Sequence, residues 1–169
     1  MSFRGTFLPH ELEWIQGRTD LLMDRKLAGL GEGKGESDRS LEQRISDTRI
    51  GVEAEAGFSK IVGLPLELSS DPDNWSELGD VAGFEVRGSR WDNPHIIIFP
   101  NDPNGRQAIV LTVRDDSFRA CGWCLIGDGK NERTRRIAEN RCRANSPRQW
   151  WVPPYDQRPM LELLQGSLL

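Results

Sequence analysis

The chain has 169 residues, a formal net charge of −4, and 28% charged against 37% hydrophobic residues. This length is enough for one domain with its own hydrophobic core. No apolar run reaches the roughly 18 residues that a membrane span needs, and the first residues lack the apolar run of a signal peptide. We therefore expect no membrane partner and a cytoplasmic location.

Two helices joined by a polar linker are expected in the first third of the chain. Pro9 stands at a first-turn position, and apolar residues follow at helical spacing, which predicts a helix over residues 8–30. Residues 31–40 are rich in glycine and charged residues and are expected to form a flexible linker. A second helix is expected to begin near residue 41 or 47 and to end at Val62, because Gly63 and Pro65 form a stop signal.

The second helix carries an apolar stripe that orients it. The stripe consists of Ile50, Ala54, Phe58 and Ile61. Glu55 lies beside this stripe and leans toward the core, where a carboxylate needs a partner or has a function. A glutamate at the rim of the core is the alternative. Glu53 and Lys60 lie seven residues apart on another face and are expected to point outward.

Four strand candidates follow and predict a sheet. They cover residues 80–89, 95–99, 108–114 and 118–124, with turn signals between them. Their close spacing favours an antiparallel meander, and the apolar runs in the second and third candidates indicate that a helix covers one face. Residues 127–131 are expected to form a loop and residues 133–143 a short basic helix. The sequence thus predicts one α+β domain over residues 1–169, with a mostly antiparallel or mixed sheet of four to five strands flanked by helices.

Acidic and basic residues separate along the chain. Residues 61–86 hold six acids and no lysine or arginine, whereas residues 130–148 hold seven bases and two acids. A metal-binding acidic edge and a phosphate-binding basic edge can share one domain, although a solvated helix face would also explain the basic run. The candidates for contact with nucleic acid are Lys130, Arg133, Arg135, Arg136, Arg141 and Arg143.

The strand at residues 80–89 carries polar groups on one face. Because a strand has period two, Glu85 and Arg87 point to the same face, and Asp80 lies one turn earlier. If Glu55 converges with Asp80 and Glu85, the three carboxylates suit Mg²⁺ or Mn²⁺, with the carbonyl of Val86 as a further ligand. Arg87 would hold phosphate or water but cannot act as a base. A half-exposed strand with a surface ion pair is the alternative.

The sequence lacks the motifs of redox, zinc-dependent, nucleotide-binding and serine-hydrolase proteins. Cys121 and Cys124 form a C-x-x-C pair, but their flanks alternate like a strand instead of opening a helix, so buried free thiols are expected. Three cysteines are an odd number, which argues against a disulfide framework. A zinc site needs four ligands, and only His10 and His95 stand beside the cysteines, so free thiols are the better interpretation. There is no P-loop, dinucleotide fingerprint or nucleophile elbow.

An acid on a helix, then an aspartate, then Glu-x-Lys on the next strand is the pattern of the PD-(D/E)XK nuclease superfamily, and this chain resembles it. More specifically, the whole chain is similar to a group of small phage-encoded proteins with a core of this kind. The matching stretches, in chain order, are residues 8–12, 51–55, 60–63, 79–80, 84–87, 95–99 with Asp102 after them, 122–123 and 151–153.

The resemblance implies a restriction-endonuclease-like fold, with a nuclease-like core over residues 41–127 and a basic segment and tail over residues 128–169. The helix acid corresponds to Glu55, the metal-binding aspartate to Asp80 and the strand glutamate to Glu85. The superfamily's catalytic lysine falls on Arg87, which is a departure, and Lys60 is the candidate for a migrated lysine. A second departure is that only residues 101–107 stand where the superfamily usually has a helix.

Three functions are open at this point. The first is a deoxyribonuclease of phage type that depends on Mg²⁺ or Mn²⁺ and acts in the host cytoplasm. The second is a catalytically inactive nuclease-fold protein, either a DNA-binding module or an inhibitor of a host protein. The third is a virion or assembly component. Retention of all three acids favours the first, whereas Arg87 and the negative net charge favour the second. A basic segment on one edge would suit a homodimer that clamps a duplex.

Overall fold

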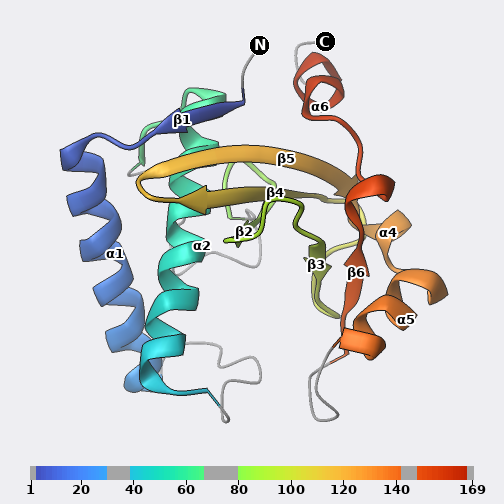
Figure 1. Ribbon diagram of the computed structural model, residues 1–169, viewed down its shortest axis with the longest axis horizontal. Helices are drawn as coiled ribbons and strands as arrows, with labels where there is room; N and C mark the ends of the chain where they lie inside the picture. The colour runs from blue at the N-terminus through green and yellow to red at the C-terminus, as the bar shows by residue number, and fades with distance from the viewer. Residues whose placement is uncertain (1–2, 30–38, 67–79, 142–147, 167–169) are drawn as a thin grey trace.

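A long helix packs against one face of a four-stranded sheet, and a small second sheet with short helices lies at the other side (Figure 1). The computed structural model describes residues 3–29, 39–66, 80–141 and 148–166. The protein is a single α+β domain with a mixed sheet flanked by helices. Residues 30–38, which include most of the expected linker, lie outside the described residues.

The described helices and strands follow one another along the chain as the colours in Figure 1 show. The helices are α1 (Pro9–Leu27), α2 (Leu41–Val62), α4 (Ile126–Gly129), α5 (Glu132–Arg141) and α6 (Met160–Gly166), with a 3-10 turn η2 at Pro154–Asp156. The strands are β1 (Arg4–Thr6), β2 (Glu85–Ser89), β3 (Ile96–Ile98), β4 (Gln107–Arg114), β5 (Ser117–Leu125) and β6 (Trp150–Val152).

Local signals in the sequence set the ends of α2. The side chain of Ser40 accepts a hydrogen bond from the backbone N–H of Gln43 at 3.2 Å, which caps the first turn. Gly63 takes the left-handed conformation, with φ of 74°, and closes the last turn. The predicted second helix and its stop signal are therefore confirmed, and the helix starts at the earlier of the two expected positions.

The four-stranded sheet has the strand order β1-β5-β4-β2. β4 and β5 form an antiparallel hairpin, and the turn residues Asp115 and Asp116 have φ angles of 44° and 61°. β2 runs parallel to β4, with Glu85 opposite Ala108. β3 leaves this sheet and pairs with β6. The antiparallel meander was therefore the wrong prediction: β3 crosses to the second sheet, and the mixed alternative is confirmed.

Two hydrophobic cores share the strand β4. The main core lies between α2 and the four-stranded sheet, and its fully buried members include Phe58, Ile109, Leu111 and Val113. The second core lies under the small sheet and consists of Ile96, Ile98, Ala108, Val110, Cys124, Ile126 and Val152. Because β4 is buried on both faces, its sequence is a nearly continuous apolar run. The expectation that a helix covers one face is confirmed by α2.

Several local expectations differ from the structure. Glu53 does not point outward: it is buried, with its carboxylate 2.9 Å from Nε of Arg49 and 2.8 Å from Nη2 of Arg90. Lys60 is half-buried, and its ammonium lies 2.6 Å from the carboxylate of Glu11 on α1. Residues 127–131 are not all loop as expected, because residues 127–129 belong to α4.

Within the described ranges, no helix is long and apolar enough to span a membrane.

Candidate functional site

A tight turn brings Asp80 beside the start of β2. Val81 and Phe84 pair across the turn, and the two residues between them, Ala82 and Gly83, have φ angles of 52° and 85°. This is the backbone of a type I′ turn, which suits glycine and reverses the chain within two residues. Oδ2 of Asp80 then accepts the backbone N–H of Val86 at 2.7 Å, so the carboxylate is held against β2.

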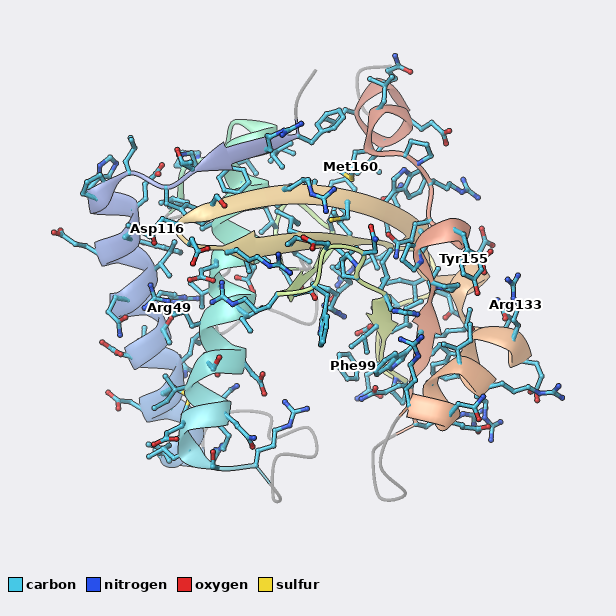
Figure 2. All side chains as sticks on the ribbon, viewed as in Figure 1. Arg49, Phe99, Asp116, Arg133, Tyr155 and Met160 are labelled. Atoms are coloured by element: carbon cyan, nitrogen blue, oxygen red, sulfur yellow. The ribbon has the colours of Figure 1, made fainter. Side chains whose placement is uncertain are left out.

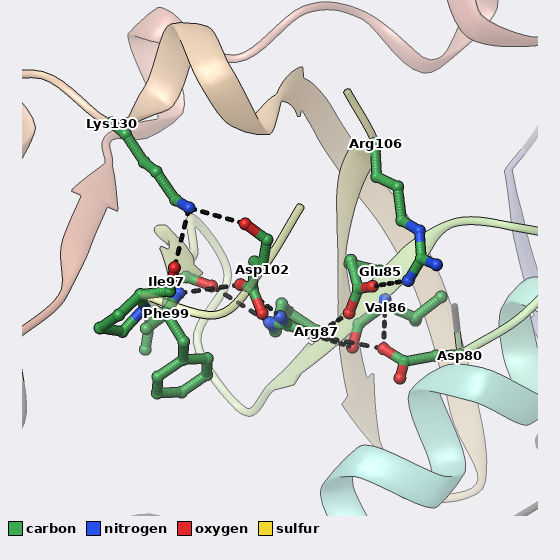
Figure 3. Close-up of polar contacts among 10 residues, drawn as sticks. Asp80, Glu85, Val86, Arg87, Ile97, Phe99, Asp102, Arg106 and Lys130 are labelled. Carbon is green, nitrogen blue, oxygen red and sulfur yellow. Dashed lines mark hydrogen bonds and ion pairs between the residues drawn. The ribbon is translucent and has the colours of Figure 1, made fainter. Parts of the chain in front are cut away.

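The guanidinium of Arg87 lies at the centre of this cluster (Figure 3). Its Nη1 atom is 3.2 Å from Oδ2 of Asp80, 3.2 Å from the carbonyl oxygen of Val86 and 3.6 Å from Oε2 of Glu85. The structure therefore brings together four of the residues that the sequence singled out. Two carboxylates and the carbonyl between them meet at one positively charged nitrogen atom.

The other donors of Arg87 bind groups from the segment around β3. Nη2 donates to Oδ2 of Asp102 at 2.7 Å, and Nε donates to the carbonyl of Ile97 at 3.1 Å. The guanidinium also lies over the ring of Phe99, 5.4 Å from its centroid. Lys130 closes the far side, since its Nζ atom donates to the carbonyls of Asp102 and Pro100 at 2.6 and 3.1 Å.

A second guanidinium neutralises Glu85. Nη1 of Arg106 lies 2.8 Å from Oε1 of Glu85, while Oε2 faces Arg87. Three carboxylates, those of Asp80, Glu85 and Asp102, thus share the site with two arginines, and the ammonium of Lys130 lies at its edge. The charges in the cluster are close to balanced, as buried charges need to be.

Burial controls the acid–base properties of the cluster. It raises the pKa of Asp80 to about 6, against the lowering effects of Arg87 and of the N–H of Val86, while Glu85 and Asp102 raise it further. Burial by itself lowers the pKa of Arg87, but the three surrounding carboxylates outweigh it and the pKa is raised. Asp80 therefore exchanges a proton near neutral pH, whereas Arg87 stays charged.

Oxygen donors of the kind that bind Mg²⁺ are present, but a guanidinium lies where they converge. Magnesium requires oxygen atoms at about 2.1 Å, and Asp80, Glu85 and the Val86 carbonyl surround Nη1 of Arg87 at 3.2 to 3.6 Å. An ion fits this position only when the Arg87 side chain turns away. Among the described residues, no three carboxylate, imidazole or thiol groups are arranged to hold an ion. Glu55 is half-buried on α2, and its place in a ligand set stays a prediction.

The expected nucleic-acid-binding residues fall into different settings. Lys130 belongs to the buried cluster. Arginines on α5 pair with nearby acids: Arg133 with Asp156 at 3.3 Å, Arg135 with Glu139 at 2.8 Å, and Arg136 with Glu132 at 3.1 Å. Arg141 is exposed at the end of α5, and Arg143 lies outside the described residues.

The sequence missed two members of the cluster, Asp102 and Arg106. In the sequence, Asp102 stands out only as the acid after a strand, and Arg106 carries no signal. Both residues stand in the turns before β4, where no periodic pattern shows which way a side chain points. Cys121 and Cys124 are free, as expected, but only Cys124 is buried, whereas Cys121 is partly exposed and Cys142 lies outside the described residues. Burial raises the pKa of Cys124 to about 12, which makes it unreactive.

No protein-family model, curated protein or solved structure matches this chain. The resemblance to small phage-encoded proteins with a nuclease-like core therefore stays a prediction. Any function assigned to the chain depends on the contacts around Arg87 and on the exposed residues of α5.

Proposed function

We propose that the protein is a metal-dependent deoxyribonuclease whose ion is held by Asp80, Glu85 and the carbonyl of Val86. The supporting observation is that these three oxygen donors surround one cationic nitrogen, Nη1 of Arg87, at 3.2, 3.6 and 3.2 Å. Carboxylates gathered in a buried site need a counter-charge. Arg87 supplies it in the metal-free protein, in the position that a divalent ion would take.

Each side chain has a definite role under this proposal. Asp80, Glu85 and the Val86 carbonyl would hold the ion, and the chemistry that such an ion would supply is an activated water and stabilisation of charge on phosphorus. Arg87, once displaced from the carboxylates, keeps its charge and its fork of donors and binds a phosphate of the substrate. Arg106 stays with Glu85 and fixes its orientation, because its Nη1 holds the oxygen that faces away from Arg87.

A second candidate is a protein that binds DNA without cutting it, and the charge balance favours it. Glu85 is neutralised by two arginines, and Arg87 is fastened by Asp102 and the carbonyl of Ile97 in addition to Asp80. Moving such a guanidinium exposes several buried acceptors at once, which is costly. A cluster of this kind can stabilise the fold without ever admitting an ion.

One experiment separates the two candidates. Purified protein is incubated with plasmid and with single-stranded DNA in Mg²⁺, Mn²⁺ or EDTA, beside Asp80→Asn and the exposed control Asp20→Asn on α1. Metal-dependent cutting that Asp80→Asn abolishes and Asp20→Asn keeps supports the nuclease. Binding in EDTA without cutting in either metal supports the second candidate. A protein that neither binds nor cuts DNA contradicts both.

A further inference from the structure

Two neighbouring hollows lie along α5, away from the buried cluster. Their volumes are about 490 and 540 Å³, within the range of roughly 300–1,000 Å³ that is usual for pockets that bind small organic groups. Both hollows are lined by Ile137, Asn140 and Tyr155. They are therefore adjacent, with these three residues between them.

Tyr155 is presented to solvent between the hollows. Tyr155 is 72% exposed, and it stands in η2 directly after Pro153 and Pro154, whose rings fix the backbone before it. The guanidinium of Arg133 lies 5.4 Å from the centre of the Tyr155 ring, and both side chains project from the outer side of the molecule (Figure 2). An exposed ring on a fixed turn binds a flat partner with little loss of conformational freedom.

The lining of the hollows carries a positive charge. Arg133, Arg136 and one acid, Glu132, line the first hollow, and Arg141 lines the second, where no acid does. The pair between Arg136 and Glu132 is largely exposed on both sides, so water and salt weaken it and a phosphate can replace the carboxylate. Burial and the charge of Arg141 lower the pKa of His95 in the second hollow, so this imidazole is neutral at pH 7.

We propose that the two hollows bind successive nucleotides of a single-stranded nucleic acid, with one base stacked on Tyr155 and phosphates held by Arg136 and Arg141. The inference rests on the proposed function, since it names the form of nucleic acid that the protein takes. An exposed aromatic face binds unpaired bases, because bases in a duplex already stack on their neighbours. Asn140 presents an amide to both hollows, and an amide can hydrogen-bond the edge of an unpaired base.

The test measures binding in EDTA, so that it does not depend on cutting. Fluorescence anisotropy with a labelled oligothymidine and with a duplex of equal length is expected to show tighter binding of the single strand. Tyr155→Ala is expected to weaken single-strand binding by about five- to a hundredfold, the effect of losing one base–aromatic stack. Tyr155→Phe keeps the ring and is expected to bind like the original protein.

Charge variants test the phosphate contacts. Arg136→Gln and Arg141→Gln are each expected to weaken binding and to reduce the dependence of log affinity on log salt by about 0.7, the value for one phosphate contact on a single strand. Arg4→Gln on β1, an exposed arginine at the far edge of the sheet, is the matched control and is expected to leave both quantities unchanged.

Each outcome decides for or against the inference. Equal binding by Tyr155→Ala and Tyr155→Phe overturns it, as does a preference for the duplex, and the proposed nuclease then stands or falls on the Asp80→Asn assay alone. Loss of binding in Tyr155→Ala with retained binding in Tyr155→Phe supports it, even if no metal produces cutting. Failure of the original protein to bind single strands overturns it directly.

Discussion

Nη2 of Arg87 donates a 2.7 Å hydrogen bond to Oδ2 of Asp102, and the same oxygen accepts the backbone N–H of Phe99 at 2.8 Å. One carboxylate oxygen thus joins β2 of the four-stranded sheet to the turn that follows β3. The Asp102 side chain is buried, with 6% exposed, and the Arg87 side chain is mostly covered, with 17% exposed. The contact between the two sheets depends on this pair as well as on apolar packing.

Removing Asp102 is expected to destabilise the fold. Asp102→Ala leaves a buried guanidinium with one carboxylate fewer and should lower the free energy of unfolding by about 3–5 kcal/mol. Asp102→Asn keeps the shape and an acceptor for Phe99 and should cost less. Urea unfolding measures both, with the exposed Asp20→Ala as a control that should change stability by no more than about 0.5 kcal/mol. Equal stabilities for Asp102→Ala and the control would contradict the role of the pair.

Arg87→Lys is expected to favour metal binding. A guanidinium has several donors and can bind Asp80 and Asp102 together, whereas a single ammonium group cannot span both carboxylates. The oxygens of Asp80, Glu85 and Val86 then have a weaker competitor, and we expect Mn²⁺ to bind about tenfold more tightly, equivalent to ~1.4 kcal/mol. Isothermal titration calorimetry measures the change. The double variant with Asp80→Asn should lose the gain, and unchanged affinity in Arg87→Lys would count against the cation position.

The titration of Asp80 should appear in the pH dependence of stability. Its pKa is raised to about 6 in the folded protein, above its ordinary value of 3.8, so the folded state binds more protons than the unfolded state between these values. The Asp80 contribution to the free energy of unfolding therefore falls as pH rises from about 4 to about 6, by an amount on the order of 2 kcal/mol. Comparing urea unfolding of the original protein with Asp80→Asn across this range isolates the slope, and a parallel pH dependence would show that the pKa is not raised.

Two glycine-to-alanine substitutions should change the free energy of unfolding in opposite directions. A Cβ on Gly88 would lie 2.3 Å from the carbonyl oxygen of Ile50, where β2 and α2 approach each other, so Gly88→Ala should destabilise by about 1–3 kcal/mol. A Cβ on Gly17, inside α1, meets nothing within 4 Å, so Gly17→Ala should stabilise by about 0.5–1 kcal/mol. Thermal unfolding of both variants measures the difference, and a stabilising Gly88→Ala would contradict the close approach.

Only the part of the polar cluster that lies close together in the sequence could be predicted. Period two along β2 and the glycine-containing turn place Asp80, Glu85 and Arg87 together without knowledge of the fold. Asp102 and Arg106 join them through tertiary contacts between turns, which leave no periodic signal. The strands β1 and β6 are not predicted either, because three residues are too few to show alternation. The equally short β3 is predicted because it lies in a run of apolar residues.

The orientation of α2 shows how a helical pattern can mislead. The apolar stripe correctly predicts the face that packs on the sheet, but Glu53 on another face is buried by Arg49 of its own helix and by Arg90 just after β2. A single stripe predicts one contact surface, whereas α2 is in contact with α1 as well as with β2, β4 and β5. Whether a charged residue at the border of those surfaces is buried depends on which arginines the rest of the chain places beside it.

The parallel pairing of β2 with β4 has a consequence for how the molecule assembles. The hairpin of β4 and β5 closes through a two-residue turn, whereas β2 reaches β4 only after the chain has passed through β3. Local hairpins form quickly, and pairings between distant segments must first overcome the entropy of loop closure. We therefore expect β2, and with it the surroundings of Arg87, to dock late in folding and to open early in partial unfolding, so that its amide protons exchange faster than those of the β4–β5 hairpin.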